Sequence, residues 1–154
     1  MGTTLRDLAS STQLTHVASG GSVAAGGMSV AGDVATALAS SNNFNYPAVD
    51  LALFASFSAA LSSLSNFINV YRRDLDIDGT NDAPAPSTAA PTFSSALVGV
   101  FSIPVFTAAS SGYFSCLNVP ISENCQLFIE NKCNITISAG WTLKCKPKTD
   151  RYVG

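Results

Sequence analysis

Aspartates with regular spacing form the stretch of this sequence that is best suited to chemistry. Carboxylate or hydroxyl side chains occupy every second position of the segment 74–82, and these residues are Asp74, Asp76, Asp78, Thr80 and Asp82. Gly79 lies among them and permits a sharp turn. On such a turn, alternate carboxylates and a backbone carbonyl can converge on one hard cation, for which oxygen ligands are preferred. The spacing therefore predicts Ca²⁺ as the cofactor of these residues.

This segment resembles the first part of the calcium loop of EF-hand proteins, with carboxylates at loop positions 1, 3, 5 and 9 and a glycine at position 6. The resemblance implies that the same residues would bind the ion. It ends before loop position 12, where Ala85 replaces a bidentate glutamate, and Pro84 disfavours the helix that would follow. The alternative interpretation is a solvated acidic turn that needs no ion.

The sequence contains no recognisable catalytic pattern. It has no glycine-rich phosphate loop, no nucleophile elbow and no pair of metal-binding histidines. His16 is the single histidine, and because no cysteine or carboxylate is near it in the sequence, it is predicted to be an ordinary surface residue. We therefore expect a protein that is not an enzyme.

The acidic segment follows a long stretch with the start and stop signals of a helix. Pro47 suits the first helical turn, and Arg72 and Arg73 suit the last turn, where cations favour the helix dipole. Apolar residues recur between them at intervals of three and four, and they are Phe54, Phe57, Leu61, Leu64, Ile68 and Tyr71. This stripe predicts one long amphipathic helix over residues 47–73 that packs against another helix. A membrane span or a lytic surface helix is the alternative, because residues 51–71 carry no charge.

Three stretches near the end of the chain alternate apolar and polar residues. They are residues 125–129, 133–137 and 141–145. Together they predict a three-stranded antiparallel β-meander with one apolar face. Its register places Cys133 opposite Cys145 and predicts a disulfide between them. Cys116 then pairs with Cys125, which makes this the favoured one of three connectivities. A zinc site formed by the four thiols is the alternative.

Charge content restricts the partners and the location of the chain. Only 12% of its 154 residues are charged, against about 25% in typical proteins, and its mean hydropathy is +0.28. Such a surface is expected to pack against other subunits or to meet lipid. The net charge of −2 argues against nucleic acid as a partner. The cysteines and the glycosylation sequon at Asn134 indicate an extracellular location or the surface of a particle.

Composition divides the chain into four parts, namely a Gly/Ala/Ser-rich flexible or extended arm (1–44), the long helix with its acidic loop (45–82), a Pro/Ala linker (83–92) and a β-rich, disulfide-tied region (93–154). Within the last part, the apolar segment 93–108 is expected to form strand, interrupted at Pro104. The expected fold class is therefore α+β.

These features favour a non-enzymatic structural subunit of a self-assembling coat, capsid or filament, whose partners are copies of itself or other coat subunits. The low charge, the apolar stripe and the lack of a catalytic set support this interpretation. A membrane-active protein that forms pores or penetrates membranes is the alternative. A secreted calcium-dependent binding module is the second alternative, and it depends on the segment 74–82.

Overall fold

The chain forms a β-sandwich. The computed structural model describes residues 3–7, 13–39, 47–62, 65–92 and 94–153. The elements are β1 (Thr3–Asp7), β2 (Leu14–Gly20), the 3-10 helix η1 (Ala31–Asp33), β3 (Leu38–Ala39), β4 (Ala48–Phe57), β5 (Phe67–Asp74), β6 (Ala96–Ser102), β7 (Ser110–Pro120), β8 (Asn124–Asn131) and β9 (Trp141–Val153).

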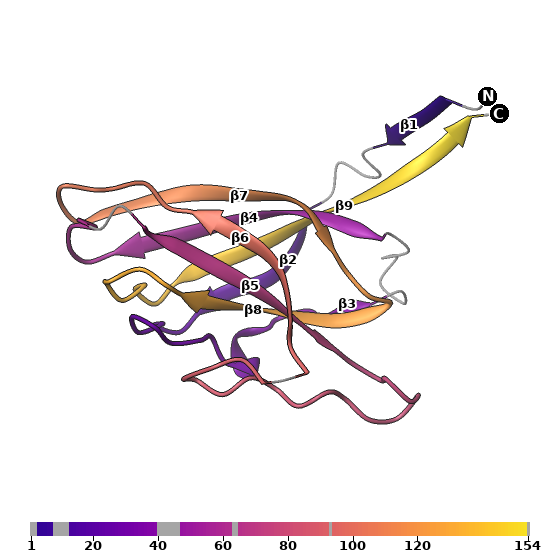
Figure 1. The fold of residues 1–154 in the computed structure, drawn as a ribbon, viewed down its shortest axis with the longest axis horizontal. Helices are drawn as coiled ribbons and strands as arrows, with labels where there is room; N and C mark the ends of the chain where they lie inside the picture. Colours follow the sequence, from indigo (N-terminus) through magenta and orange to yellow (C-terminus); the bar gives the residue numbers. More distant parts are fainter. Residues whose placement is uncertain (1–2, 8–12, 40–46, 63–64, 93, 154) are drawn as a thin grey trace.

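Two antiparallel sheets make up the sandwich. The first is five-stranded, in the order β1-β9-β4-β7, with β2 also paired to β9, and the second is four-stranded, in the order β3-β8-β5-β6. Figure 1 shows the end of β9 and β1 leaving the sandwich together as a two-stranded ribbon. Thr3 pairs with Val153 in this ribbon, so the first and last described residues lie side by side.

Strict alternation along β4 builds the core of the sandwich. Its inward side chains are buried and the residues between them are half-buried, and the inward set is Val49, Leu51, Leu53, Ala55 and Phe57. From the other sheet, Ile68 and Val70 of β5 and Leu127 and Ile129 of β8 meet this set. Burial of each Val, Leu, Ile or Phe side chain stabilises the folded state by about 1.5–3 kcal/mol. The alternation therefore fixes which face of each sheet points inward.

The predicted helix over residues 47–73 is wrong. This segment forms β4 and β5, one in each sheet, and the described residues contain no helix of seven residues or more. From Val49 to Phe57 the sequence alternates as a strand does, and it also has the three- and four-residue spacing of a helix. Pairing of β4 with both β7 and β9 favours the strand. The α+β fold class is therefore wrong as well. None of the described helices has the length and hydropathy needed to cross a bilayer.

The predicted packing stripe divides between the core and the outer faces. Phe57, Leu61 and Ile68 are buried, whereas Phe54 and Tyr71 are half-buried on strands whose alternate residues form the core. Leu64 lies outside the described residues. A helix would have placed all of these side chains on one face. In the sandwich they do not form one continuous apolar surface.

The predicted β-meander is also wrong. Residues 125–129 lie within β8 and residues 141–145 within β9, but these strands belong to different sheets. Residues 133–137 form no strand, and Ile137 makes only isolated bridges, to Val23 and Phe57. Asn131 holds the turn after β8, because its side-chain nitrogen donates to the carbonyls of Val23 (3.0 Å) and Ile135 (2.9 Å). The chain thus crosses from one sheet to the other where a hairpin was expected.

No disulfide forms among the four cysteines, which are free thiols, so the predicted pairings of Cys133 with Cys145 and Cys116 with Cys125 are wrong. Cys133 lies in no strand, and Cys145 of β9 lies opposite Leu14 on one side and Leu51 on the other. The register from which the pairing was predicted does not occur.

Two segments that were predicted as an arm and a linker lie against the sandwich. The described residues 13–39 contribute β2 and β3 to the sheets. Residues 83–92 run beside the loop before η1, where the amide of Met28 donates to the carbonyl of Thr88 at 2.8 Å. Met28, Ala83 and Phe128 are buried, although they lie outside the main core between the sheets. These loops therefore cover β8.

Candidate assembly interface

The last strands of the two sheets meet at one side of the sandwich. Among the described residues, β7 pairs only with β4 and β6 only with β5, so each has an open edge. The two strands approach closely at Gly99, where a β carbon would lie 2.8 Å from the Sγ of Cys116. We call residues 96–120, which comprise β6, β7 and their connection, the β6–β7 edge. It presents unpaired backbone groups of both sheets on one side of the molecule.

The β6–β7 edge carries no charge. No Asp, Glu, Lys, Arg or His occurs between Asp82 and Glu123. Open edge strands are usually protected by charged side chains, particularly lysine, because an unprotected edge pairs readily with other strands. This edge lacks that protection along its whole length. It is therefore suited to pairing with another chain.

Exposed hydrophobic side chains gather on the same edge. Among the residues whose exposure is described, seven large hydrophobic side chains are exposed, and five of them belong to this edge, namely Leu97, Val100, Val105, Tyr113 and Leu117. Within this edge, the largest exposed fractions are those of Tyr113 (79%) and Leu117 (62%) on β7. The ring of Tyr113 packs on Phe54 with a centroid distance of 5.0 Å, which holds it on the outer face of the first sheet. Concentrations of this kind are typical of surfaces that contact other proteins or membranes.

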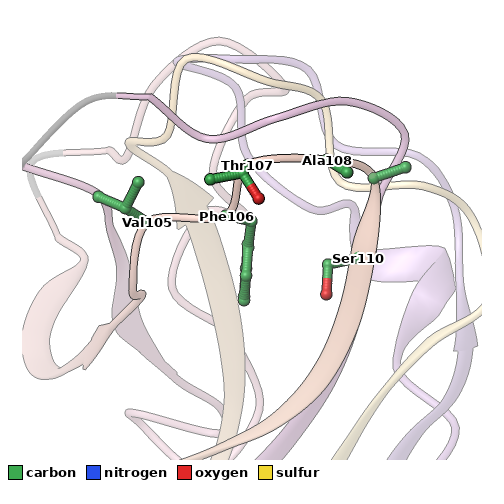
Figure 2. Close-up of a pocket in the computed structure, with 6 residues that line it drawn as sticks. Val105, Phe106, Thr107, Ala108 and Ser110 are labelled. Carbon is green, nitrogen blue, oxygen red and sulfur yellow. The ribbon is translucent and has the colours of Figure 1, made fainter.

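The connection between β6 and β7 forms a shallow cavity of about 270 Å³. Its lining is one continuous segment, Val105, Phe106, Thr107, Ala108, Ala109 and Ser110. Figure 2 shows Thr107 and Ala108 above the hollow, with Phe106 and Ser110 on its sides. Phe106 also packs against Phe57 at a centroid distance of 6.0 Å. Because the lining holds no titratable side chain, the cavity extends the uncharged surface and offers no group for acid or base chemistry.

The far end of β7 is anchored by polar contacts. Asn118 has a left-handed backbone (φ 56°), and its amide donates to Oδ1 of Asp50 at 3.0 Å. Asp50 also forms an ion pair with Lys148 at 2.5 Å. The ladder with β4 is irregular between Val49 and Leu51, next to this contact. The regular part of the ladder with β4 is therefore residues 110–116, and Leu117 and Asn118 lie in the irregular part that follows it.

The acidic segment 74–82 forms a loop in which each carboxylate has its own partner. Asp74 accepts a hydrogen bond from Ser122 (2.5 Å) and pairs with Arg72 (2.9 Å). Asp76 has a left-handed backbone (φ 52°) and accepts a hydrogen bond from the amide group of Asn124 at 2.6 Å. These partners hold the first two carboxylates against the end of β8 and not against a common centre.

The second half of the loop is held in the same manner. Asp78 accepts hydrogen bonds from the side chain of Asn81 (2.7 Å) and from the backbone amides of Asn81 (2.7 Å) and Thr80 (3.0 Å), and these bonds lower its pKa. Asp82 accepts the amide of Asp76 (3.1 Å) and pairs with Arg73 (3.4 Å). Within the described residues, no three His, Cys, Asp or Glu side chains are placed to hold a metal ion.

Calcium binding at this loop stays a prediction. To bind Ca²⁺, the loop would have to exchange the donors of Asp76 and Asp78 for the ion. Calorimetric titration of Ca²⁺ into chelator-treated protein, with the melting temperature measured in parallel, tests it. Binding to the folded state would raise the melting temperature as the Ca²⁺ concentration increases. Absence of both heat and a thermal shift would remove the calcium-dependent interpretation.

Three of the thiols are poorly suited to metal or redox chemistry. Burial raises the pKa of Cys133 to about 11 and also raises those of Cys125 and Cys145, so the thiolate is disfavoured. The zinc alternative has no support from these groups.

Asn134 is exposed, as a glycosylated residue must be. Its glycosylation stays a prediction.

Glu130 is a buried carboxylate on β8. It is 5% exposed, and its donors are Asn69 of the paired strand (2.8 Å), Lys132 (2.9 Å) and the hydroxyl of Tyr71. Burial raises its pKa, but the hydrogen bonds and the Lys132 charge outweigh that effect, so the pKa is lowered overall. The carboxylate is fully used in joining β5 to β8. It is therefore a structural group.

His16 is buried, and its prediction as a surface residue is wrong. Its side chain is fully enclosed, Nδ1 donates to the carbonyl of Thr36 (2.7 Å), and Nε2 accepts the amide of Leu127 (2.9 Å). Desolvation by burial lowers its pKa to about 4, although both backbone contacts act to raise it. β3 pairs with β8 only at Asn124 and Cys125, and the neutral ring of His16 supplies the hydrogen-bonding partner for β8 at Leu127. With both nitrogens used, it has no free group for catalysis.

Sequence reasoning did not identify the β6–β7 edge, but part of the signal is present. Within the uncharged stretch, the outward positions of β7 alternate between small polar and large apolar residues, which are Ser111, Tyr113, Ser115 and Leu117.

Comparison with known protein families, with curated proteins and with solved structures found no match to this chain.

Proposed function

We propose that this protein is a non-enzymatic structural subunit that assembles with copies of itself, or with other coat subunits, into a coat, capsid or filament. The observation that carries the proposal is the β6–β7 edge, which combines open strand edges, exposed large hydrophobic side chains and no charge. A protein that stays monomeric gains nothing from such a surface, because an uncovered apolar edge promotes aggregation. Covering it in an ordered assembly removes this cost.

The location proposed for the assembly is extracellular or on the surface of a particle. Because the four cysteines are free thiols, disulfides no longer support this location. The proposal of this location therefore depends on the exposed sequon at Asn134. The membrane-active alternative loses the helix on which it depended. It remains as an outcome of the following experiment.

Sedimentation velocity and electron microscopy in lipid-free buffer test the proposal. The expected result is a concentration-dependent assembly that persists at high salt, because an uncharged contact is not weakened by screening. A monomer at every concentration and salt would contradict the proposal. A monomer that also releases dye from liposomes would instead support the membrane-active alternative.

A further inference from the structure

We propose that β7 pairs with β7 of a second copy, antiparallel and about a twofold axis at Ser115, so that the two five-stranded sheets become one continuous sheet. This inference rests on the proposed function and adds the contact strand, the symmetry and the register. The binding partner is thus a second copy of this chain, and backbone hydrogen bonds between open edges join the two.

β7 is better suited to this pairing than β6. It has eleven residues against seven, and its ladder with β4 is continuous from Ser110 to Cys116. The ladder of β6 with β5 is interrupted next to Val70. Pro120 lies at the end of β7, beyond the anchor at Asn118, so every residue of β7 before this proline has a backbone N–H. Of these two strands, β7 therefore offers the longer unbroken ladder to a second copy.

Charge favours a second copy as the partner. In a twofold contact the same strand lies against its own copy, so an edge that carries charges of one sign repels itself. β9 is an example of a strand that would repel its own copy, because lysines occupy alternate positions along it, namely Lys144, Lys146 and Lys148. β7 carries no charge at all. It is therefore compatible with its own copy.

The side chains of β7 select the register. With the axis at Ser115, this serine faces its own copy, and Tyr113 faces Leu117 of the second copy. The same pair forms twice, and an aromatic ring beside an aliphatic side chain is a favourable cross-strand combination. A shift of the axis to Phe114 would place Tyr113 opposite Ser115 and would leave the two largest exposed side chains without apolar partners. The arrangement about Ser115 is the one that covers both.

Cross-linking tests the register directly. Residues directly opposite in an antiparallel pair have Cα atoms about 4.5–5.5 Å apart, which suits a disulfide. The variant Ser115→Cys, treated with oxidised glutathione, is expected to form a covalent dimer. Two thiols lose two protons and two electrons, and the glutathione disulfide is reduced. Ser111→Cys is the matched control, because Ser111 is exposed on the same strand but away from the axis. This variant and the wild-type protein should remain uncross-linked.

Charge insertion tests the strand. Tyr113→Lys and Leu117→Lys each introduce two like charges at the contact, and we expect at least a tenfold weaker self-association by sedimentation equilibrium. Ile77→Lys is the matched control, since Ile77 is 63% exposed on the loop 74–82, outside the β6–β7 edge, and the self-association of this variant should be unchanged. Thermal melting should show all three variants folded.

The outcomes separate this inference from the proposed function. If the wild-type protein assembles, but Ser115→Cys does not cross-link or Tyr113→Lys assembles normally, the β7 pairing is wrong and the structural function stands. If the wild-type protein is monomeric at every concentration, both are wrong.

Discussion

Gly20→Ala is expected to lower the free energy of unfolding by about 3 kcal/mol, the sum of overpacking and a lost hydrogen bond. A β carbon at Gly20 would lie 2.0 Å from Cε2 of Trp141. The indole cannot move aside freely, because it is 1% exposed and its Nε1–H donates to the carbonyl of Gly21 at 2.7 Å. Any displacement of the ring therefore breaks this bond or disturbs the surrounding core.

Urea denaturation followed by tryptophan fluorescence measures this effect, since Trp141 is the single tryptophan of the chain. Gly32→Ala is the matched control. A β carbon there meets nothing within 4 Å, and its stability should change by no more than about 0.5 kcal/mol. Equal stabilities of the two variants would show that β2 and Trp141 do not pack as closely as described.

Local pattern predicted two of the strands correctly. The alternating stretches 125–129 and 141–145 do lie in strands. Their connection could not be predicted, because the crossover between sheets depends on Asn131 and its contact with Val23, which is distant in sequence. A three-residue hairpin loop and this crossover have the same local appearance. The error in topology then produced the error in the cysteine pairing.

The helix prediction failed where two periodicities coincide. The segment 47–73 satisfies a helical stripe through Phe54 and Phe57, but it also alternates from Val49 to Phe57. Only long-range pairing separates these interpretations, because β4 pairs with β7 and β9, which follow it by at least fifty residues. Tertiary context therefore outweighed the cap signals at Pro47 and Arg73.

The candidate interface was predictable in kind but not in place. Low charge indicated a contact surface, and the apolar segment 93–108 was expected to form strand; β6 lies within it. Which strands have open edges depends on the order of strands in each sheet. No local pattern around Tyr113 or Leu117 contains that order. The interface could therefore be located only once the fold was known.

His16 is expected to make the stability of the protein depend on pH. In the unfolded chain its pKa is near 6.5, whereas burial lowers it to about 4 in the folded protein. Between these values the unfolded chain binds a proton that the folded protein does not, so stability rises with pH through this window. At about 1.4 kcal/mol per pKa unit, acidification from pH 6.5 to 4 should remove about 3 kcal/mol from this group alone.

His16→Phe separates this effect from the titration of carboxylates. The variant keeps an aromatic ring but leaves the amide of Leu127 and the carbonyl of Thr36 unpaired, which should cost about 2–4 kcal/mol at pH 7. Because phenylalanine does not titrate, the difference in stability from wild type should shrink as the pH falls from 6.5 to 4. Parallel stability curves, measured by urea denaturation across this range, would contradict it. The comparison is selective because the chain has one histidine, which serves as the hydrogen-bonding partner of β8 in place of a strand.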